Sequence, residues 1–388
     1  MTATKAFAAL CLGAAALAVH VTAGAQAEPY KVFDTRPVIT EGPYLSALSD
    51  TSVSVMWMTD TPSHAKVRLK DGETVREIEP QVDGLVPVGQ RHVVTLTGLA
   101  PGKRYSYEAI ATRVVKLKPY WPDKGLSTSS PAVAFTTFSP QQETISFSVV
   151  TDTHEDTARI VRLMKMVDWA NTDALLHLGD AFHWLDSEEQ LWSKWLRPTV
   201  AAQGPGKPLL FARGNHELRG PFARELAGYV PTPEGKYYYS RAMGPVHLLV
   251  LDTAEDKPDD TNVYARLNRT VPYRESELAW LSEQVGGDKH FASAPFRVVA
   301  MHQGDWGWLP DNGAAWTALA NQAGIDLVIA GHDHAFSYQP PDKAHAYHRL
   351  VLGQDQLARV DATGRTLTVK VTTGKGAPVH VLTIPSRR

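Results

Sequence analysis

Short apolar runs that end in metal-binding residues constrain the fold of this sequence more than any other feature. The run Ile325–Ala330 is rich in β-branched residues and lies between two glycines, as is typical of a buried strand. Gly331-His332-Asp333-His334 follows it directly. Four further runs end in the same way: Ile145–Val150 before Asp152 and His154, Ala174–Leu178 before Asp180, Pro208–Ala212 before Asn215 and His216, and Phe296–Met301 before His302. Ligands bind at the carboxyl ends of strands in α/β sheets, so we expect these polar side chains to converge at one edge.

Helical patterns separate these runs. The apolar residues at helical spacing are Ile160, Leu163, Met164 and Val167 after the first run, and Leu278, Leu281 and Val285 further along. Alternation of strands and helices predicts an α/β sheet with parallel pairing and helices on both faces.

Residues 36–139 follow a different pattern, in which short alternating runs are separated by turn signals. The runs are Ser52–Trp57, His64–Leu69, Val93–Leu96, Tyr105–Ile110 and Ala132–Thr136. This spacing predicts a β-sandwich. Trp57 and the segment Leu99–Tyr105 resemble a fibronectin type III domain, in which the tryptophan packs in the core and the tyrosine makes a corner hydrogen bond. The long segment 116–130 either reaches the candidate site or forms a solvated hairpin tip.

The net charge and the N-terminal segment limit the classes of protein to which this chain can belong. The net charge of −2 gives no electrostatic reason to expect binding to nucleic acid or to an anionic membrane. Lys5, the apolar run Ala6–Val19 and the motif Ala25-Gln26-Ala27 indicate a signal peptide over residues 1–27. The alternative is an uncleaved anchor, but an apolar run of about 14 residues is short for a bilayer. Removal of this segment would also remove Cys11, the only cysteine. We therefore expect a secreted or periplasmic protein without disulfides and without stable membrane association.

The polar groups form an ordered set of motifs. These are Asp152-X-His154, Gly179-Asp180, Gly214-Asn215-His216-Glu217, Val299-Ala-Met-His302 and Gly331-His332-X-His334. The set resembles the calcineurin-like metallophosphoesterase superfamily, and the fibronectin-like region before it makes the chain resemble the purple acid phosphatase branch. The resemblance implies an α/β metallophosphoesterase sandwich of mixed sheets flanked by helices over residues 143–388. It also implies a preceding all-β, fibronectin type III-like domain over residues 36–139.

The resemblance further implies two divalent metal ions, which could be zinc, manganese or iron. It assigns Asp152, His154, Asp180 and His334 to the first ion, and Asp180, Asn215, His302 and His332 to the second, so that Asp180 bridges them. A metal pair of this kind lowers the pKa of a bound water, orients the water in line with phosphorus and neutralises the phosphoryl oxygens. We therefore expect direct attack of a metal-activated hydroxide on a small-molecule phosphate ester, with phosphomonoesters as the first expectation. The alternatives are a phosphodiesterase or nucleotide-type hydrolase, and a non-catalytic, metal-stabilised binding protein.

Other residues near the motifs are candidates for catalysis and substrate binding. In the family the histidine that matches His216 contacts the phosphate and helps to protonate the leaving oxygen, so His216 is the expected general acid. His183, Trp184 and Trp306 are candidates for substrate binding, with packing or solvation of their loops as the alternative. Asp305 is a candidate for orienting His302, with a solvated loop carboxylate as the alternative.

Two positions depart from the purple acid phosphatase pattern. The branch carries a tyrosine where this chain has His183, and typically a glycine where this chain has His154. An imidazole would thus replace a phenolate at the first ion, which removes an anionic ligand and the preference for a trivalent metal. We expect a colourless protein that binds divalent metals.

Overall fold

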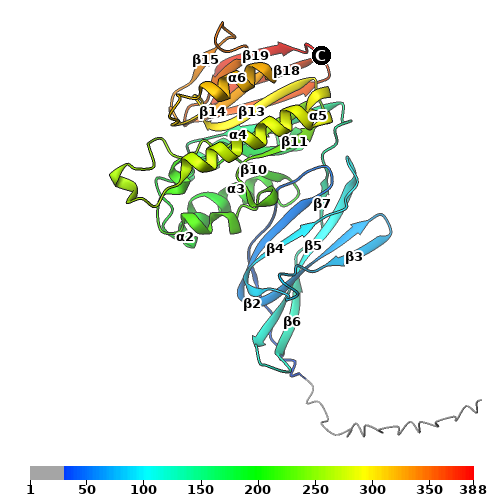
Figure 1. Cartoon of the computed structure of the whole chain (residues 1–388). Helices are drawn as coiled ribbons and strands as arrows, with labels where there is room; N and C mark the ends of the chain where they lie inside the picture. Colours follow the sequence, from blue (N-terminus) through cyan, green and yellow to red (C-terminus); the bar gives the residue numbers. More distant parts are fainter. Residues whose placement is uncertain (1–29) are drawn as a thin grey trace, which may run out of the picture.

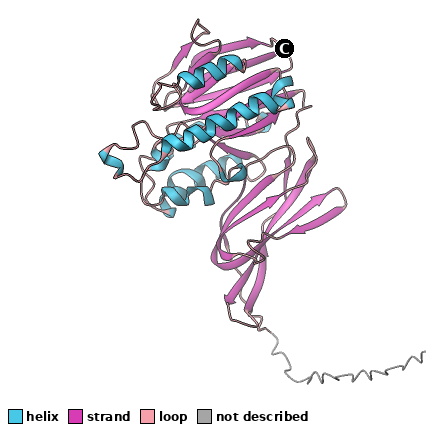
Figure 2. Ribbon diagram, in the orientation of Figure 1, coloured by secondary structure: helices cyan, strands magenta, loops and turns pink. Residues whose placement is uncertain are grey.

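The structure is a computed structural model and describes residues 30–388. The predicted signal peptide and Cys11 lie outside the described residues. Figures 1 and 2 show a region made of strands alone and, beyond it, a larger region of sheets flanked by helices. Among the described residues, no helix is long and apolar enough to cross a membrane.

The first part of the described chain is all-β. Its strands are β1 (Ile39–Ser46), β2 (Val53–Asp71), β3 (Thr74–Ile78), β4 (Val88–Leu96), β5 (Arg104–Lys116), β6 (Asp123–Ser129) and β7 (Val133–Thr136). The runs at 52–57 and 64–69, which were expected to be separate strands, both belong to β2. That prediction was wrong because β2 continues through a register shift against β4, between Met58 and Ser63, instead of turning there.

Two aromatic residues of the all-β region have the structural roles that the sequence predicted. Trp57 is fully buried in the core. The Oη atom of Tyr105 accepts a hydrogen bond from Ala100 N at 2.8 Å. The segment 116–130 pairs as the β5–β6 hairpin, and Figure 1 places β6 at the end of the molecule away from the helices. It is therefore a hairpin tip and does not line the candidate site.

The second part of the chain adds strands to two sheets. The first sheet gains β8 (Thr144–Val150), β9 (Ala174–His177), β10 (Pro208–Phe211), β17 (Gln356–Thr363), β18 (Thr366–Thr373) and β19 (Pro378–Pro385). The second sheet contains β11 (Tyr239–Met243), β12 (Val246–Val250), β13 (Phe296–Gln303), β14 (Leu327–Gly331), β15 (Ser337–Gln339) and β16 (His348–Val351). All five expected strands form, and β8, β9 and β10 are parallel neighbours, as are β12, β13, β14 and β16. Antiparallel strands at the edges make both sheets mixed.

Helices cover the outer faces of the two sheets, and the main core lies between the sheets (Figure 1). The α-helices are α1 (Thr157–Met166), α2 (Glu188–Leu191), α3 (Arg197–Gln203), α4 (Thr270–Gly287), α5 (Lys289–Ser293) and α6 (Ala314–Gln322). The shorter turns are η1 (Trp169–Asn171), η2 (Trp192–Leu196), η3 (His216–Leu218), η4 (Ala223–Gly228), η5 (Pro233–Gly235) and η6 (Asn262–Tyr264). Helix α1 begins after Asp156, whose side chain accepts a hydrogen bond from Arg159 N at 2.9 Å. It buries Ile160, Leu163 and Met164, as their spacing predicted.

Candidate metal centre

The loops that follow β8, β9 and β14 have an unusual backbone. Asp152, His154, Asp180, His332 and His334 all have positive φ angles, between 43° and 76°. Residues other than glycine rarely adopt this left-handed region, and each such residue costs about 1–3 kcal/mol. The surrounding fold therefore holds these side chains in place against their own backbone preference, which is common at functional sites.

The residues predicted for the first ion lie together. Asp152, His154, Asp180 and His334 each offer a ligand atom, and these atoms lie within 4.8 Å of one another. His154 Nδ1 donates to Phe182 O at 3.0 Å, which leaves Nε2 unprotonated and free to bind a metal. That atom lies 2.9 Å from His334 Nε2. Two imidazole nitrogens that bind one ion at right angles are also about 2.9 Å apart, since each bond is about 2.0–2.1 Å long.

The residues predicted for the second ion form an adjoining cluster. The ligand atoms of Asp180, His302 and His332 also lie within 4.8 Å of one another. His302 Nδ1 donates to Leu178 O at 2.6 Å, so the ring turns Nε2 toward Asp180. The side chain of Asn215, the fourth predicted ligand, is fully buried and its amide oxygen has no protein partner.

The carboxylate of Asp180 lies between the two clusters. Its Oδ1 atom accepts a hydrogen bond from His216 N at 3.0 Å. Its Oδ2 atom lies 3.9 Å from His154 Nε2 and 3.1 Å from His302 Nε2. One oxygen is therefore fixed by the backbone, and the other is placed to contact ions in both clusters.

Unpaired buried atoms show that these residues fit metal ions. Asp152 Oδ1, Asn215 Oδ1 and His332 Nδ1 are all buried without a hydrogen-bond partner. A buried polar atom without a partner costs about 1–3 kcal/mol, so folded proteins rarely keep several in one place. Imidazole nitrogen together with carboxylate and amide oxygen suits zinc, iron and manganese. The two clusters are therefore able to bind a dinuclear metal centre.

The charges of the site follow from burial and from close pairs. Burial disfavours a charge on Asp180, but His302 outweighs it and holds the pKa of Asp180 well below its usual range. Burial also disfavours the charged form of His302 and by itself lowers the pKa of this imidazole. The nearby Asp180 carboxylate outweighs burial and raises that pKa to about 10. Burial lowers the pKa of His154 to about 4, so this ligand is neutral at pH 7. Binding of an ion at His302 therefore has to displace a proton.

Glu217 supports the site in a way that the sequence did not reveal. It is fully buried, and its carboxylate accepts hydrogen bonds from the backbone N–H groups of Asp180, Ala181 and Gly214 at 2.7–2.8 Å. Burial, followed by the charge of Asp180, raises its pKa to about 7. The carboxylate joins the loop after β9 to the loop after β10 and so fixes the spacing between Asp180 and Asn215. Its place next to the Gly-Asn-His motif was the only sequence signal.

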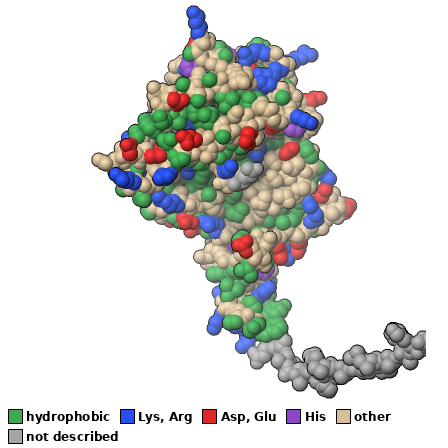
Figure 3. Space-filling view, viewed as in Figure 1, with side chains coloured by type: hydrophobic (Ala, Val, Ile, Leu, Met, Phe, Trp, Pro, Cys, Tyr) green, Lys and Arg blue, Asp and Glu red, His purple; other side chains and the backbone are tan. Residues whose placement is uncertain are grey.

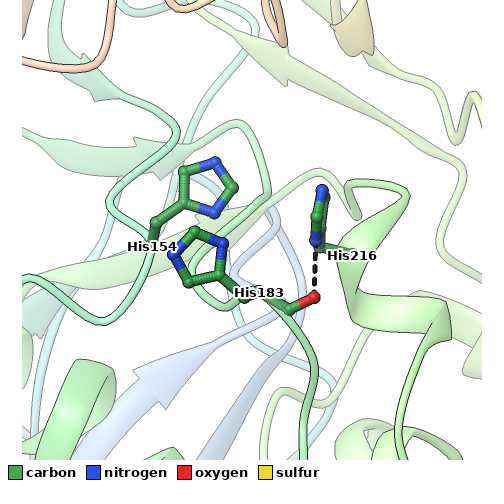
Figure 4. Close-up of side chains that lie close together, drawn as sticks. All are labelled: His154, His183 and His216. Carbon is green, nitrogen blue, oxygen red and sulfur yellow. Dashed lines mark hydrogen bonds between the residues drawn. The ribbon is translucent and has the colours of Figure 1, made fainter.

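His216 lies beside the ligands, as the sequence predicted. Its Nδ1 atom donates to His183 O at 2.5 Å (Figure 4). Its Nε2 atom lies 3.8 Å from Asp180 Oδ2. The ring of His183 stacks on that of His154, with centroids 4.5 Å apart and planes at 19°. His183 is therefore at the mouth of the site, in contact with the ligand His154, although the first-ion cluster forms without it.

Arg219 is a second group that the sequence did not reveal. Its Nη1 atom lies 3.3 Å from His216 Nε2. Its Nη2 atom donates to Glu255 at 2.7 Å and to Asp256 at 3.0 Å. Tyr264 Oη also donates to Glu255, at 2.9 Å. This network ties the loop after β12 to the residues around His216, which short-range sequence patterns do not report.

The expected aromatic rim is only partly present. Trp184 is 54 % exposed, and its Nε1 atom donates to Asp186 at 2.8 Å. Trp306 was wrongly expected to bind substrate: it is buried against Trp316, and its Nε1 atom donates to Thr317 Oγ1 at 2.9 Å. Its ring packs against apolar side chains of the core under α6.

The expectation for Asp305 was also wrong. The Nδ1 atom of His302 donates to the carbonyl of Leu178 and not to this carboxylate. Asp305 is exposed and accepts a hydrogen bond from Gly307 N at 3.3 Å.

Metal-binding clusters at the carboxyl ends of the parallel strands of a mixed α/β sandwich define a metalloprotein of the hydrolase type. Residues 145–336 match the family model of the calcineurin-like phosphoesterases. This match identifies residues 145–336 as a calcineurin-like phosphoesterase domain, and the protein is a metallophosphoesterase.

Solved structures share the fold at low sequence identity. A purple acid phosphatase, PPD1, from yellow lupin (Lupinus luteus) has a TM-score of 0.65 at 13 % identity, over 90 % of this chain and 74 % of that chain. A structure of PhoD has a TM-score of 0.59 at 11 % identity, over 91 % of this chain and 94 % of that chain. No curated protein sequence gives a significant match. Identities this low establish the fold alone.

Proposed function

We propose that this protein is a secreted phosphatase that hydrolyses small phosphate monoesters with two divalent metal ions. One observation carries the proposal. The free oxygen of Asp180 is shared by the two ligand clusters, and His216 Nε2 lies 3.8 Å from it. A bridging carboxylate beside a proton donor that binds neither ion suits metal-assisted hydrolysis of a phosphate ester.

The ligand residues have separate tasks in this proposal. Asp152, His154 and His334 would hold one ion, Asn215, His302 and His332 the other, and Asp180 would contact both. When bound, such a pair lowers the pKa of a water molecule and neutralises charge on the phosphoryl oxygens. The Leu178 and Phe182 carbonyls fix which nitrogen of His302 and His154 faces the ions.

The groups around His216 support a monoester substrate. His216 would hold the proton that the leaving oxygen receives, because its Nδ1 atom is bonded to His183 O and only Nε2 faces the site. Arg219 would bind a phosphoryl oxygen through Nη1, since its Nη2 atom is already bonded to Glu255 and Asp256. Two donors beside the metal ligands suit the extra charge of a monoester dianion.

The remaining parts of the proposal rest on the sequence and the first domain. Secretion is proposed from the Lys5 and Ala6–Val19 pattern. A fibronectin type III-like domain over residues 36–139 is supported by the burial of Trp57 and by the Tyr105 hydrogen bond. Neither feature enters the chemistry of the metal centre.

Kinetics with matched aryl esters test the proposal. We expect the purified protein to hydrolyse p-nitrophenyl phosphate with a higher kcat/KM than bis(p-nitrophenyl) phosphate, and to lose both activities with a chelator. A higher kcat/KM on the diester would make the protein a phosphodiesterase. Absence of both activities from protein loaded with zinc, manganese or iron would favour a metal-stabilised binding protein.

A further inference from the structure

The hairpin tip of the all-β region exposes an unusual set of apolar side chains. They come from the tip of the β5–β6 hairpin and from the first described residues, which are Leu117, Tyr120, Trp121, Tyr30, Val32 and Phe33; we call this set the aromatic tip. Tyr120 is 80 % exposed and Leu117 65 %. The two segments lie side by side, because Val32 pairs with Lys124 in a β-bridge. Figure 3 shows hydrophobic and basic side chains at this narrow end of the molecule.

The aromatic tip is also basic, although the whole chain is not. Residues 30–36 and 116–125 carry five cations, Lys31, Arg36, Lys116, Lys118 and Lys124, against two carboxylates, Asp34 and Asp123. The chain as a whole has a net charge of −2. The positive charge is therefore concentrated around the exposed rings, and the net charge of the chain conceals it.

Backbone pairing orders the aromatic tip before any partner binds. Phe33 N donates to Lys124 O, and Lys124 N donates to Lys31 O, both at 2.9 Å. Lys118 and Asp123 form an ion pair of 2.7 Å across the hairpin. Binding through this surface would thus lose little conformational entropy.

We propose that the aromatic tip is a docking surface for an anionic lipid bilayer. Tryptophan and tyrosine favour the interface between water and the acyl chains, and lysines beside them are attracted to anionic headgroups. A protein partner fits less well, because the centres of protein interfaces are depleted in lysine.

This docking is peripheral and reversible. A few interfacial rings and about three net positive charges give weak binding, unlike a membrane-spanning helix. The sequence-based prediction of no stable membrane association concerns such spanning or anchoring and is compatible with it. Figure 1 places the hairpin at the end of the all-β region that lies away from the helices, so docking would hold the metal centre away from the bilayer. The inference is independent of which phosphate ester is hydrolysed.

Vesicle sedimentation with the mature chain, without residues 1–27, tests the proposal. We expect binding to vesicles of phosphatidylglycerol and phosphatidylethanolamine that weakens with salt, and little binding to phosphatidylcholine vesicles. The variant Tyr120→Ser/Trp121→Ser should lose at least tenfold in partition coefficient, with unchanged phosphatase activity. Lys116→Gln should lose about fivefold, the effect of one cation near an anionic surface. Because all variants begin at the same residue and differ only at the substituted positions, the differences report on the aromatic tip alone.

A matched control separates this site from general hydrophobicity. Val263 and Leu267 are 74 % and 70 % exposed on a different loop, so Val263→Ser/Leu267→Ser removes comparable apolar surface. This variant should bind vesicles like the unmodified chain. Equal losses in both double variants would overturn the proposal, and so would equal binding to neutral and anionic vesicles. Concentration-dependent dimerisation that Tyr120→Ser/Trp121→Ser abolishes, without vesicle binding, would also overturn it and identify a protein interface.

Discussion

Two carboxylate-to-amide substitutions should remove different numbers of metal ions. In Asp180→Asn, the amide oxygen should take the position of Oδ1, because His216 N donates there at 3.0 Å. The amide nitrogen then replaces Oδ2, which is the oxygen that faces both clusters. In Asp152→Asn, the oxygen should take the position of Oδ2, which accepts from Thr151 Oγ1 and His332 N at 2.7 and 2.9 Å. Its nitrogen replaces only Oδ1, which faces the first cluster. An amide nitrogen has no lone pair for a metal.

The expected size of the effect follows from linkage. Loss of a partner that merely orients a ligand costs about 10–100-fold in metal affinity, so loss of a direct ligand should cost at least about 100-fold. At a metal concentration of about 100 Kd, each ion stabilises the fold by about 2.7 kcal/mol, and at about 1 Kd by only about 0.4 kcal/mol. The unmodified protein should therefore gain about 5.4 kcal/mol from metal. Asp152→Asn should gain about 3.1 kcal/mol and Asp180→Asn about 0.8 kcal/mol.

Metal analysis after gel filtration and denaturant unfolding with and without metal measure these differences. We expect two bound ions in the unmodified protein, one in Asp152→Asn and none in Asp180→Asn. As a control, Asp305→Asn should retain both ions, because Asp305 is an exposed carboxylate on a nearby loop. Equal metal content in Asp152→Asn and Asp180→Asn, or two tightly bound ions in Asp180→Asn, would refute the assignment of Asp180 as the bridge.

Three further outcomes are expected. His216→Ala should keep both ions and lower kcat by roughly 10²–10⁴-fold, less for p-nitrophenyl than for alkyl esters; equal losses on both would mean that His216 is not the acid. The purified protein should be colourless, and His154→Ala should lose the first ion alone; an intense visible charge-transfer band would contradict this ligand set. Burial lowers the pKa of His92 to about 4, so the unfolded state binds more protons between pH 6.5 and 4. The free energy of unfolding should thus fall by up to about 3 kcal/mol as pH drops through that range, and His92→Gln should flatten the dependence.

The strands that carry the ligands could be predicted from sequence because each is short and apolar. Buried parallel strands appear as nearly continuous apolar runs, and such runs precede Asp152, Asp180, Asn215, His302 and His332 in the chain. The rule that ligands bind at the carboxyl ends then brings these residues together without knowledge of the sheet order. The sequence could not indicate which carbonyl fixes each imidazole, since that depends on the order of the strands.

The parts that escaped prediction depend on contacts distant in sequence. Glu217 binds backbone groups 36 and 37 residues away, and Arg219 pairs with Glu255, also 36 residues away. Trp306 follows His302 closely in the chain, yet its ring turns into the core under α6. Distance along the chain from a ligand is therefore a weak guide to whether a loop side chain faces the substrate.

The sheet topology changes how the two regions relate. The sequence predicted that the all-β domain ends at residue 139 and that the next domain begins at residue 143, and β7 and β8 lie on either side of these residues. However, β1 pairs antiparallel with β2 and parallel with β10, through Leu45 to Pro208 and Ser46 to Leu209, so one 13-stranded sheet runs through both regions. An exposed edge on β10 would leave its backbone groups unpaired. The edge of β10, the strand that precedes Asn215 and His216, is thus paired with β1 of the all-β region. The all-β region is therefore part of the scaffold of the metal centre.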